Sequence, residues 1–285
     1  MKWENRRQST QVEDRRGHSG GRRGGGVALS GGGLILVLIL ALVFKIDPMT
    51  LLGDGSGMGG QTSSEASRSQ EEDRLARFAG TVLADTEEIW TAEFERMGLE
   101  YEKPRMVLFT EAVNSGCGYA SSQVGPFYCP ADRTIYLDLS FFDEMATRFG
   151  AAGDFAQAYV IAHEVGHHVQ NLLGISGQVQ EARQRANKVQ SNQLSVRLEL
   201  QADFLAGMWA RRGQEKFDFM EEGDIEEAMR AAKAIGDDAL QKQAQGHVVP
   251  DSFTHGTSEQ RMRWFMKGFR GEAFDPQNTF TARDL

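Results

Sequence analysis

Cysteine is scarce in this chain, which holds only two among its 285 residues. Cys117 and Cys129 lie twelve positions apart, and neither belongs to a Cys-x-x-Cys pair, so the sequence does not favour a cysteine-ligated metal site. In an oxidising compartment the two thiols would close a short loop as a disulfide. Two free buried thiols are the alternative.

The positive charge that nucleic-acid binding needs is also missing from most of the chain. The net charge is −9, and residues 1–26 alone carry +4 from seven basic and three acidic side chains, which leaves −13 for residues 45–285 because residues 27–44 are uncharged. A region this acidic is a poor candidate for contact with phosphate backbones. We therefore expect no nucleic-acid partner, and we interpret residues 1–26 as a basic cytoplasmic leader.

The uncharged residues 27–44 form the longest apolar stretch, with Leu34–Leu40 at its centre. Eighteen helical residues span about 27 Å, roughly the thickness of a bilayer core. No convincing Ala-x-Ala cleavage site follows, which favours a single transmembrane signal anchor over a cleaved secretory signal. The basic leader would then stay in the cytoplasm, and the rest of the chain would lie on the periplasmic or extracellular side of the inner (plasma) membrane.

The remaining sequence divides into a linker and one domain. Residues 45–70 are rich in Gly and Ser and predict a flexible linker. Residues 71–285 predict a mostly helical α+β domain with a small sheet and no internal repeat. We expect helices at 71–98, 155–173, 178–212, 224–245 and 258–269, and strands at 104–110 and 134–139.

One helical segment contains the motif His163-Glu164-x-x-His167. The segment 155–173 lacks proline, follows Asp154 as a helix N-cap, and ends before Gly174. Positions i and i+4 share one face of a helix, so both histidines can reach one metal ion. Glu164 lies between them, where it can hold and deprotonate a water. This combination predicts a catalytic zinc site, with Zn²⁺ as the cofactor.

A third protein ligand must come from elsewhere in the chain. Of the other histidines, His18 would lie across the membrane, and His168 points to a different face of the helix, so a capped or solvated side chain is its default interpretation. Glu199 is the better candidate, because it lies on another predicted helix 32 positions after His167. Asp203 is one turn further on the same face, where it can accept the second N–H of a ligating histidine.

The motif with Glu199-x-x-Ala202-Asp203 resembles the gluzincin arrangement. More narrowly, the whole chain resembles the YpfJ-like bacterial neutral zinc metallopeptidase family. The features that carry this resemblance are the motif helix and the segments Met1–Glu4, Val12–Gly17, Gly116–Gly118, Gly125–Asp132 and Leu139–Phe142. The resemblance implies a zincin-like metallopeptidase domain, a zinc cofactor and a peptide or protein substrate.

The expected reaction is hydrolysis of a peptide bond by a zinc-activated water, with Glu164 as the base. His255 is the candidate donor to the developing oxyanion, because Ser252–Arg261 resembles the His-Pro-x-x-x-x-Arg stretch of the wider gluzincin group, although Gly256 replaces the proline. A surface histidine near an N-cap serine is the alternative. The strand at 134–139 could be the edge along which an extended peptide binds.

Two other classes of function compete with a peptidase. One is a non-catalytic, membrane-anchored protein that keeps zinc for structure. The other is a zinc amidase that acts on a cell-wall or lipid amide. The sequence does not define the physiological substrate or the oligomeric state.

Overall fold

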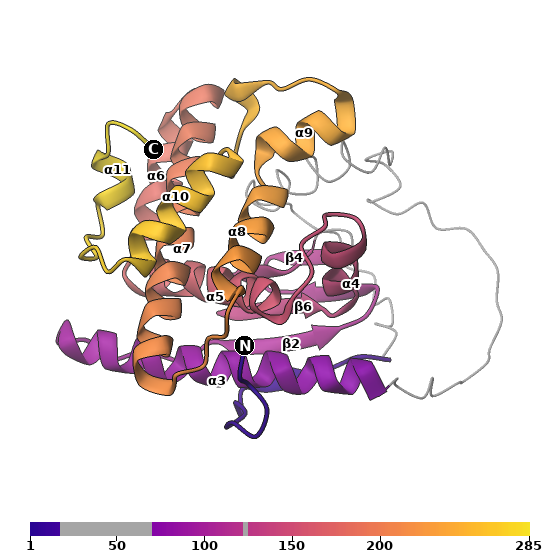
Figure 1. Ribbon diagram of the computed structural model, residues 1–285. Coiled ribbons are helices and arrows are strands. Elements are labelled where there is room, and N and C mark those ends of the chain that lie inside the picture. The colour runs from indigo at the N-terminus through magenta and orange to yellow at the C-terminus, as the bar shows by residue number, and fades with distance from the viewer. Residues whose placement is uncertain (18–69, 122–124) are drawn as a thin grey trace.

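The computed structural model of the 285-residue chain describes residues 1–17, 70–121 and 125–285. This part is mostly helical with a small sheet, which confirms the predicted α+β class (Figure 1). The strands are β1 (Val12–Asp14), β2 (Arg105–Phe109), β3 (Ala112–Ser115), β4 (Gly118–Ser121), β5 (Phe127–Cys129) and β6 (Thr134–Asp138). The helices are α3 (Gln70–Arg96), α4 (Ser140–Thr147), α5 (Asp154–Leu172), α6 (Ile175–Arg185), α7 (Lys188–Phe217), α8 (Asp224–Ala234), α9 (Asp237–Gln245), the 3-10 turn η2 (Pro250–Ser252), α10 (Ser258–Phe269) and α11 (Asn278–Thr281).

The main sheet has the strand order β1-β2-β6-β5, and β3 and β4 form a separate antiparallel pair. Strands β1, β2 and β6 run parallel, whereas β5 runs antiparallel to β6. The expectation that the strand at 134–139 offers an open edge is therefore wrong, since β6 is paired on both sides. The edge strand on that side is β5, which the disulfide between Cys117 and Cys129 ties to the start of β4.

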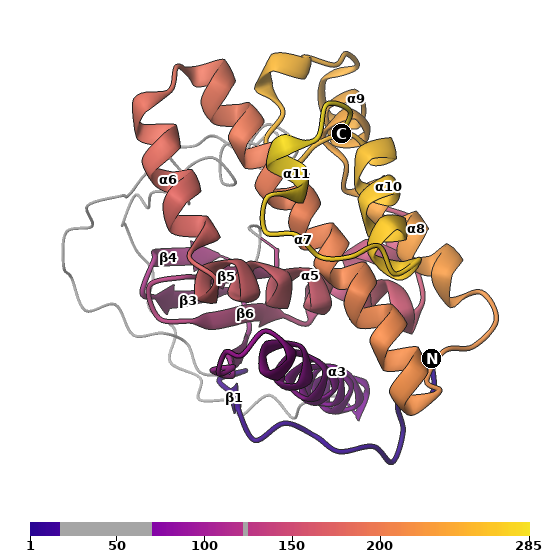
Figure 2. The ribbon, with the colours of Figure 1, turned by 90° about the vertical axis from the view of Figure 1, so that its left-hand side faces the viewer.

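Helix α5 lies at the centre of the fold, in contact with α3, α7 and α8 (Figure 2). Its apolar residues recur at helical spacing, and Tyr159, Val165 and Val169 are fully buried. Burial of each such side chain contributes about 1.5–3 kcal/mol, so this face fixes the helix in the core. The helix ends where Gly174 adopts a left-handed conformation with φ of 74°, as the sequence predicted.

The beginning of α5 differs from the prediction. Gly153 occupies the N-cap position with φ of 122°, and Asp154 is the first helical residue rather than the cap. The Glu227 side chain of α8 fills the space beside Gly153 and accepts a hydrogen bond from the backbone N–H of Phe155 at 3.0 Å. The Glu227 carboxylate, rather than the Asp154 side chain, thus accepts a hydrogen bond from the first turn of α5.

Two predicted helices are each divided in the structure. The segment 178–212 comprises α6 and α7, because Asn187 caps α7 through a reciprocal capping box with Gln190. The segment 224–245 comprises α8 and α9, which meet at Gly236. A side chain at Gly236 would collide with the backbone and hydroxyl of Ser258, so the start of α10 packs directly on this junction.

Residues 1–17, which we interpreted as part of a basic leader, pack against the domain that begins at residue 70. They run along α3 from the end of α7 to the sheet, as Figure 2 shows. The backbone N–H of Lys2 donates to Phe219 O at 2.7 Å, and that of Ser9 donates to Gly80 O at 2.9 Å. Strand β1 then adds to β2 in parallel register.

Among the described residues, no helix combines the length and apolar character that crossing a membrane requires. The expected transmembrane segment 27–44 lies outside them. So do residues 18–26 of the expected leader, including His18, and the expected linker up to residue 69.

Candidate active site

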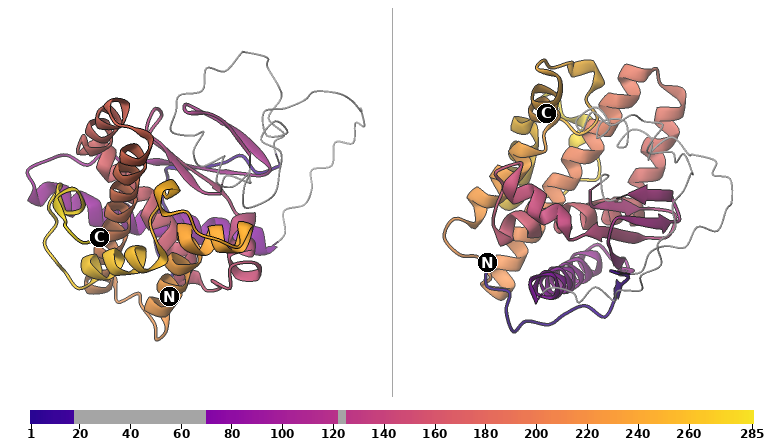
Figure 3. Two further views of the ribbon diagram at one scale, coloured as in Figure 1. Left: turned by 90° about the horizontal axis from the view of Figure 1, so that it is seen from above. Right: turned by 90° about the vertical axis from the view of Figure 1, so that its right-hand side faces the viewer.

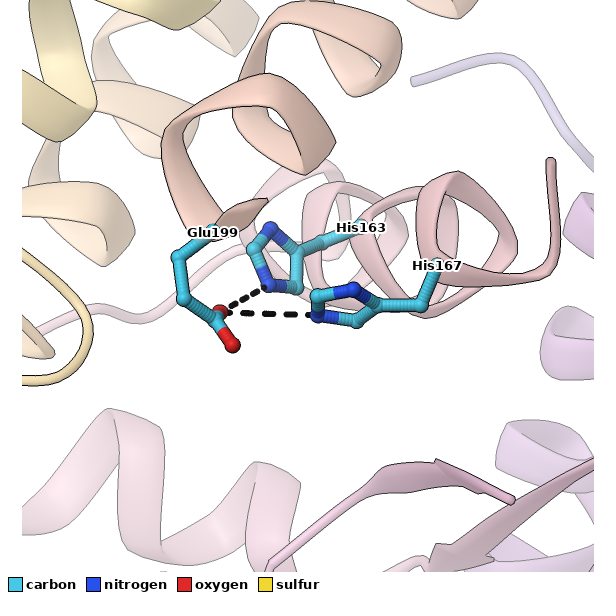
Figure 4. Close-up of side chains that lie close together, drawn as sticks. All are labelled: His163, His167 and Glu199. Carbon is cyan, nitrogen blue, oxygen red and sulfur yellow. Dashed lines mark hydrogen bonds and ion pairs between the residues drawn. The ribbon is translucent and has the colours of Figure 1, made fainter. Parts of the chain in front are cut away.

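Two helices bring the proposed metal ligands together. His163 and His167 project from one face of α5, and Glu199 projects toward them from α7 (Figure 4). Glu199 Oε2 lies 3.1 Å from His163 Nε2 and 3.4 Å from His167 Nε2. One ligand atom from each of the three residues lies within 4.8 Å of the others, which is compact enough for a single ion.

The opposite ring nitrogen of His163 is fixed by a buried acid. Asp203 Oδ1 lies 2.9 Å from His163 Nδ1, and an ionised carboxylate can only accept, so Nδ1 carries the proton. The hydroxyl of Tyr159 donates to the same oxygen at 2.5 Å, and Arg261 Nε donates to Asp203 Oδ2 at 2.9 Å. Burial raises the pKa of Asp203, but Arg261 and His163 outweigh it and lower the pKa below its ordinary value.

A neutral amide fixes the second histidine in the same way. Gln170 Nε2 donates to the carbonyl of Leu198 at 2.7 Å and to Gln201 Oε1 at 3.2 Å, which leaves its own oxygen facing His167 Nδ1 at 2.9 Å. His167 Nδ1 must therefore donate. Because Nδ1 of each ring is engaged by its acceptor, each ring presents Nε2 on the side of Glu199, and this is the nitrogen that would bind a metal ion in place of a proton.

The electrostatics of the cluster also suit a cation. Burial raises the pKa of Glu199, but His167, His255 and His163 outweigh it and hold the pKa well below the ordinary value, so the carboxylate is ionised. Burial lowers the pKa of His163, whereas Asp203 and Glu199 raise it to about 9. Two buried carboxylates beside the ring thus favour a positive charge at this point. A divalent cation on the two Nε2 atoms and Glu199 would supply it.

Glu164 faces the same region from the next position of α5 and is only 8% exposed. Burial raises the pKa of its carboxyl group, while His167 and His163 act in the opposite direction. The backbone N–H of Tyr128, on the edge strand β5, hydrogen-bonds to the carboxylate. Glu164 therefore lies between the histidines and the open edge of the sheet.

His168 is not the capped or solvated side chain that we expected, since it is fully buried. Its Nε2 donates to the carbonyl of Glu102 at 2.7 Å, and its Nδ1 accepts from the hydroxyl of Tyr128 at 3.0 Å. Asn171 Nδ2 donates to the same hydroxyl at 3.0 Å. His168 and Asn171 thereby join α5 to β5 through one tyrosine.

His255 lies in the loop before α10, with its side chain 18% exposed. Asp237 Oδ2 holds this loop by accepting from the backbone N–H groups of Thr254, His255 and Gly256 at 2.8, 2.6 and 2.9 Å. Burial lowers the pKa of His255, but the negative charges of Glu199 and Asp237 raise the pKa overall. The ring therefore lies within range of electrostatic interaction with Glu199. Gly256 has φ of 93°, which proline cannot adopt, and this accounts for the glycine.

Several residues of this network were absent from the sequence-based site: Tyr128, Tyr159, Gln170, Asp237 and Arg261. Their contacts join residues far apart in the chain, up to 102 positions in the case of Tyr159 and Arg261. The contact of Gln170 could have been predicted from the sequence, because Gln170 lies three positions after His167 and is therefore its neighbour on the helix. The contacts of the other four residues depend on tertiary packing, which no local sequence pattern reveals.

A second acidic cluster lies at the start of α5 and consists of Asp154, Asp224 and Glu227. The amino group of Met1 lies 2.6 Å from Asp154 Oδ1 and 3.4 Å from Asp224 Oδ1. A cation of the chain itself thus faces these carboxylates, in contrast to the cluster around Glu199.

The chain belongs to the family described as "Putative neutral zinc metallopeptidase", which it matches over residues 1–280. The family resemblance inferred from the sequence is thereby confirmed. The chain is 51% identical to "Uncharacterized protein YpfJ" of Escherichia coli strain K12 over 286 residues, which cover 98% of this chain and 99% of that protein. It is 45% identical to "Uncharacterized protein Rv2575" of Mycobacterium tuberculosis strain H37Rv over 197 residues, or 65% of each chain. No solved structure matches, so the zincin-like classification stays a prediction.

Proposed function

We propose that this chain is a zinc-dependent peptidase that hydrolyses peptide bonds. The observation that carries the proposal is the orientation of the two histidines. His163 and His167 each donate Nδ1–H to a fixed acceptor and turn Nε2 toward the ionised Glu199. Glu164 adds a buried carboxylate beside this donor set.

The roles of the residues follow from their positions. His163, His167 and Glu199 would hold the zinc ion, and Asp203 would orient His163. The chemistry that zinc supplies at such a site is a lower pKa for water and polarisation of a carbonyl. Glu164 accepts the proton of the attacking water and passes it to the leaving amine. His255 is the candidate donor to the developing oxyanion, because it lies near Glu199 on a loop that Asp237 fixes.

An extended substrate fits the free edge of β5. This strand is paired only with β6 among the described strands, and it carries Tyr128 beside Glu164. A peptide that added to this edge would receive backbone hydrogen bonds and pass the site in an extended conformation. Such binding favours a peptide or protein substrate over a lipid amide, which has no run of backbone N–H and C=O groups to pair.

The location of the enzyme is part of the proposal. Association of residues 27–44 with the inner (plasma) membrane rests on their apolar sequence. The disulfide between Cys117 and Cys129 supports an oxidising, periplasmic or extracellular compartment for the domain.

The test compares Glu164→Gln with wild type and with Glu181→Gln, an exposed glutamate on α6. Purified zinc-loaded full-length proteins would be assayed for bound zinc and for cleavage of an unfolded protein. We expect Glu164→Gln to keep its zinc but to lose about 10²–10⁴-fold in rate, and Glu181→Gln to match wild type.

Other outcomes distinguish the alternatives. Zinc binding without hydrolysis of any substrate by wild type would favour a structural zinc protein. Release of an amine only from cell-wall or lipid amides would favour an amidase. Wild-type turnover by zinc-loaded Glu164→Gln would overturn the role of Glu164 as the base.

A further inference from the structure

The described residues on either side of residues 18–69 lie close to each other. Arg16 shows this, since it is 5% exposed and its guanidinium pairs with Asp14 Oδ2 at 2.7 Å and with Asp73 Oδ1 at 3.1 Å. Asp73 belongs to the first turn of α3, whereas Asp14 ends β1. Arg16 and Asp73, which flank residues 18–69 in the sequence, are therefore in direct contact.

The contacts of residues 1–17 extend over the whole segment. Trp3 is 7% exposed and packs edge-on against Phe78 of α3, with 5.3 Å between the ring centroids. Strand β1 pairs in parallel register with β2, with Val12 opposite Met106. The right-hand view of Figure 3 shows the segment passing beneath α3 to the sheet. Removal of these residues would expose the apolar side chain of Phe78 and leave β2 as an edge strand.

Arg6 and Arg7 of the segment meet acids on α3. Arg6 lies 2.7 Å from Asp85 Oδ1, and its guanidinium also stacks 4.2 Å from the centroid of the Phe217 ring. Arg7 lies 3.1 Å from Glu87 Oε2. Asp85 and Glu87 are buried, so these two carboxylates depend on the arginines for a counter-charge. Arg6, Arg7 and Arg16, three of the basic residues of the leader, thus form ion pairs with the domain.

We infer that residues 1–17 and the domain 70–285 lie on the same side of any membrane with which the chain associates. A single crossing between residues 17 and 70 would place Arg6 and Asp85, and β1 and β2, on opposite sides, and the contacts above could not form. The membrane orientation of this chain therefore cannot be read from its basic residues by the positive-inside rule. The inference is independent of the proposed peptidase activity.

The test places one new thiol on each part of an otherwise unchanged chain. Thr10→Cys lies in the N-terminal segment and Gln243→Cys on α9, and both positions are exposed. Intact cells that produce either variant would be treated with a membrane-impermeant maleimide and compared with lysed cells. The unaltered chain gives the background from its own two cysteines.

We expect the two variants to behave alike, either both labelled or both protected in intact cells. Labelling of one variant and protection of the other would overturn the inference. A second comparison uses purified full-length protein. Arg6→Asp should lower the midpoint of urea unfolding, whereas Lys2→Asp should leave it nearly unchanged, because Lys2 and its partner Asp218 are 54% and 79% exposed. Equal effects of the two substitutions would contradict the docking of this segment.

Discussion

Gly166, in the middle of the metal-binding motif, packs directly against Ala202 of α7. A Cβ atom placed on Gly166 would lie 3.0 Å from Ala202 O and 3.1 Å from Ala202 Cα. The two helices can approach this closely only because position 166 lacks a side chain. The approach matters for the site, since α5 carries His163 and His167 while α7 carries Glu199.

We predict that Gly166→Leu weakens zinc binding and lowers the free energy of unfolding by about 1–3 kcal/mol, because the larger side chain forces α5 and α7 apart. The matched control is Gly177→Leu on α6, where a Cβ atom meets nothing within 4 Å. Zinc titration and urea unfolding of both variants would measure the difference. Unchanged zinc affinity in a folded Gly166→Leu protein would contradict the proposed role of this contact.

The proposed ligands and the residue behind them should differ in their effect on zinc. We predict that His163→Ala, His167→Ala and Glu199→Ala lose tight zinc binding, and that Asp203→Asn loses only about 10- to 100-fold in affinity, as expected for a group that orients a ligand. Asparagine is preferred to alanine at position 203 because its side-chain oxygen can still accept a hydrogen bond from the buried Arg261, whereas alanine offers no acceptor.

Competition with a zinc chelator of known affinity would give the dissociation constants of these variants. Glu259→Ala on the exposed face of α10 serves as the control, with its side chain 78% exposed. Wild-type affinity in Glu199→Ala would remove Glu199 from the ligand set.

The motif helix could be predicted from sequence because its signals are local. Buried residues at helical spacing and Gly174 at its end define α5 without reference to the rest of the fold. The start of α7 could also have been predicted from the sequence, since Asn187 and Gln190 have the spacing of a capping box. The junction at Gly236 was not readable, because it depends on contact with Ser258 twenty-two positions away.

The site was predictable only where residues share a helix. His163, Glu164 and His167 follow from one motif, and Glu199 and Asp203 were found through their spacing on a second apolar helix. Tyr128 and Arg261 reach the site from other elements across 40 and 58 positions, which no local pattern encodes. The contacts of residues 1–17 could not be predicted for another reason. Basic residues before an apolar stretch give the same sequence pattern whether they orient a membrane segment or pair with acids on α3.

The disulfide should stabilise the edge strand. Cys129 is fully buried on β5, whereas Cys117 is exposed. We predict that protein from the exported compartment is two hydrogens lighter than the dithiol under non-reducing conditions. Cys117→Ser should lower the free energy of unfolding by up to about 3 kcal/mol, the value of the chain-entropy model for a loop of this size. Ser115→Ala, beside the loop, is a control that keeps both thiols. Two alkylatable thiols in the exported wild-type protein would contradict the prediction.

The last prediction concerns the response of the fold to acid. Burial lowers the pKa of His168 to about 4, although the carbonyl of Glu102 acts in the opposite direction. The unfolded chain therefore binds this proton more readily than the folded chain, so the stability associated with neutral His168 is complete above pH of about 6.5 and is lost as the pH falls toward 4. A shift of this size corresponds to about 3 kcal/mol.

Urea unfolding of metal-free protein at several pH values would measure this dependence, with His168→Gln as the comparison. Glutamine cannot titrate, so the variant should be less stable than wild type at pH 7 but should lose less stability between pH 6.5 and 4. Both proteins keep His163, His167 and His255, and the difference between their slopes therefore isolates His168. Parallel slopes would mean that folding does not lower the pKa of His168, which would contradict the burial of a neutral ring at this position.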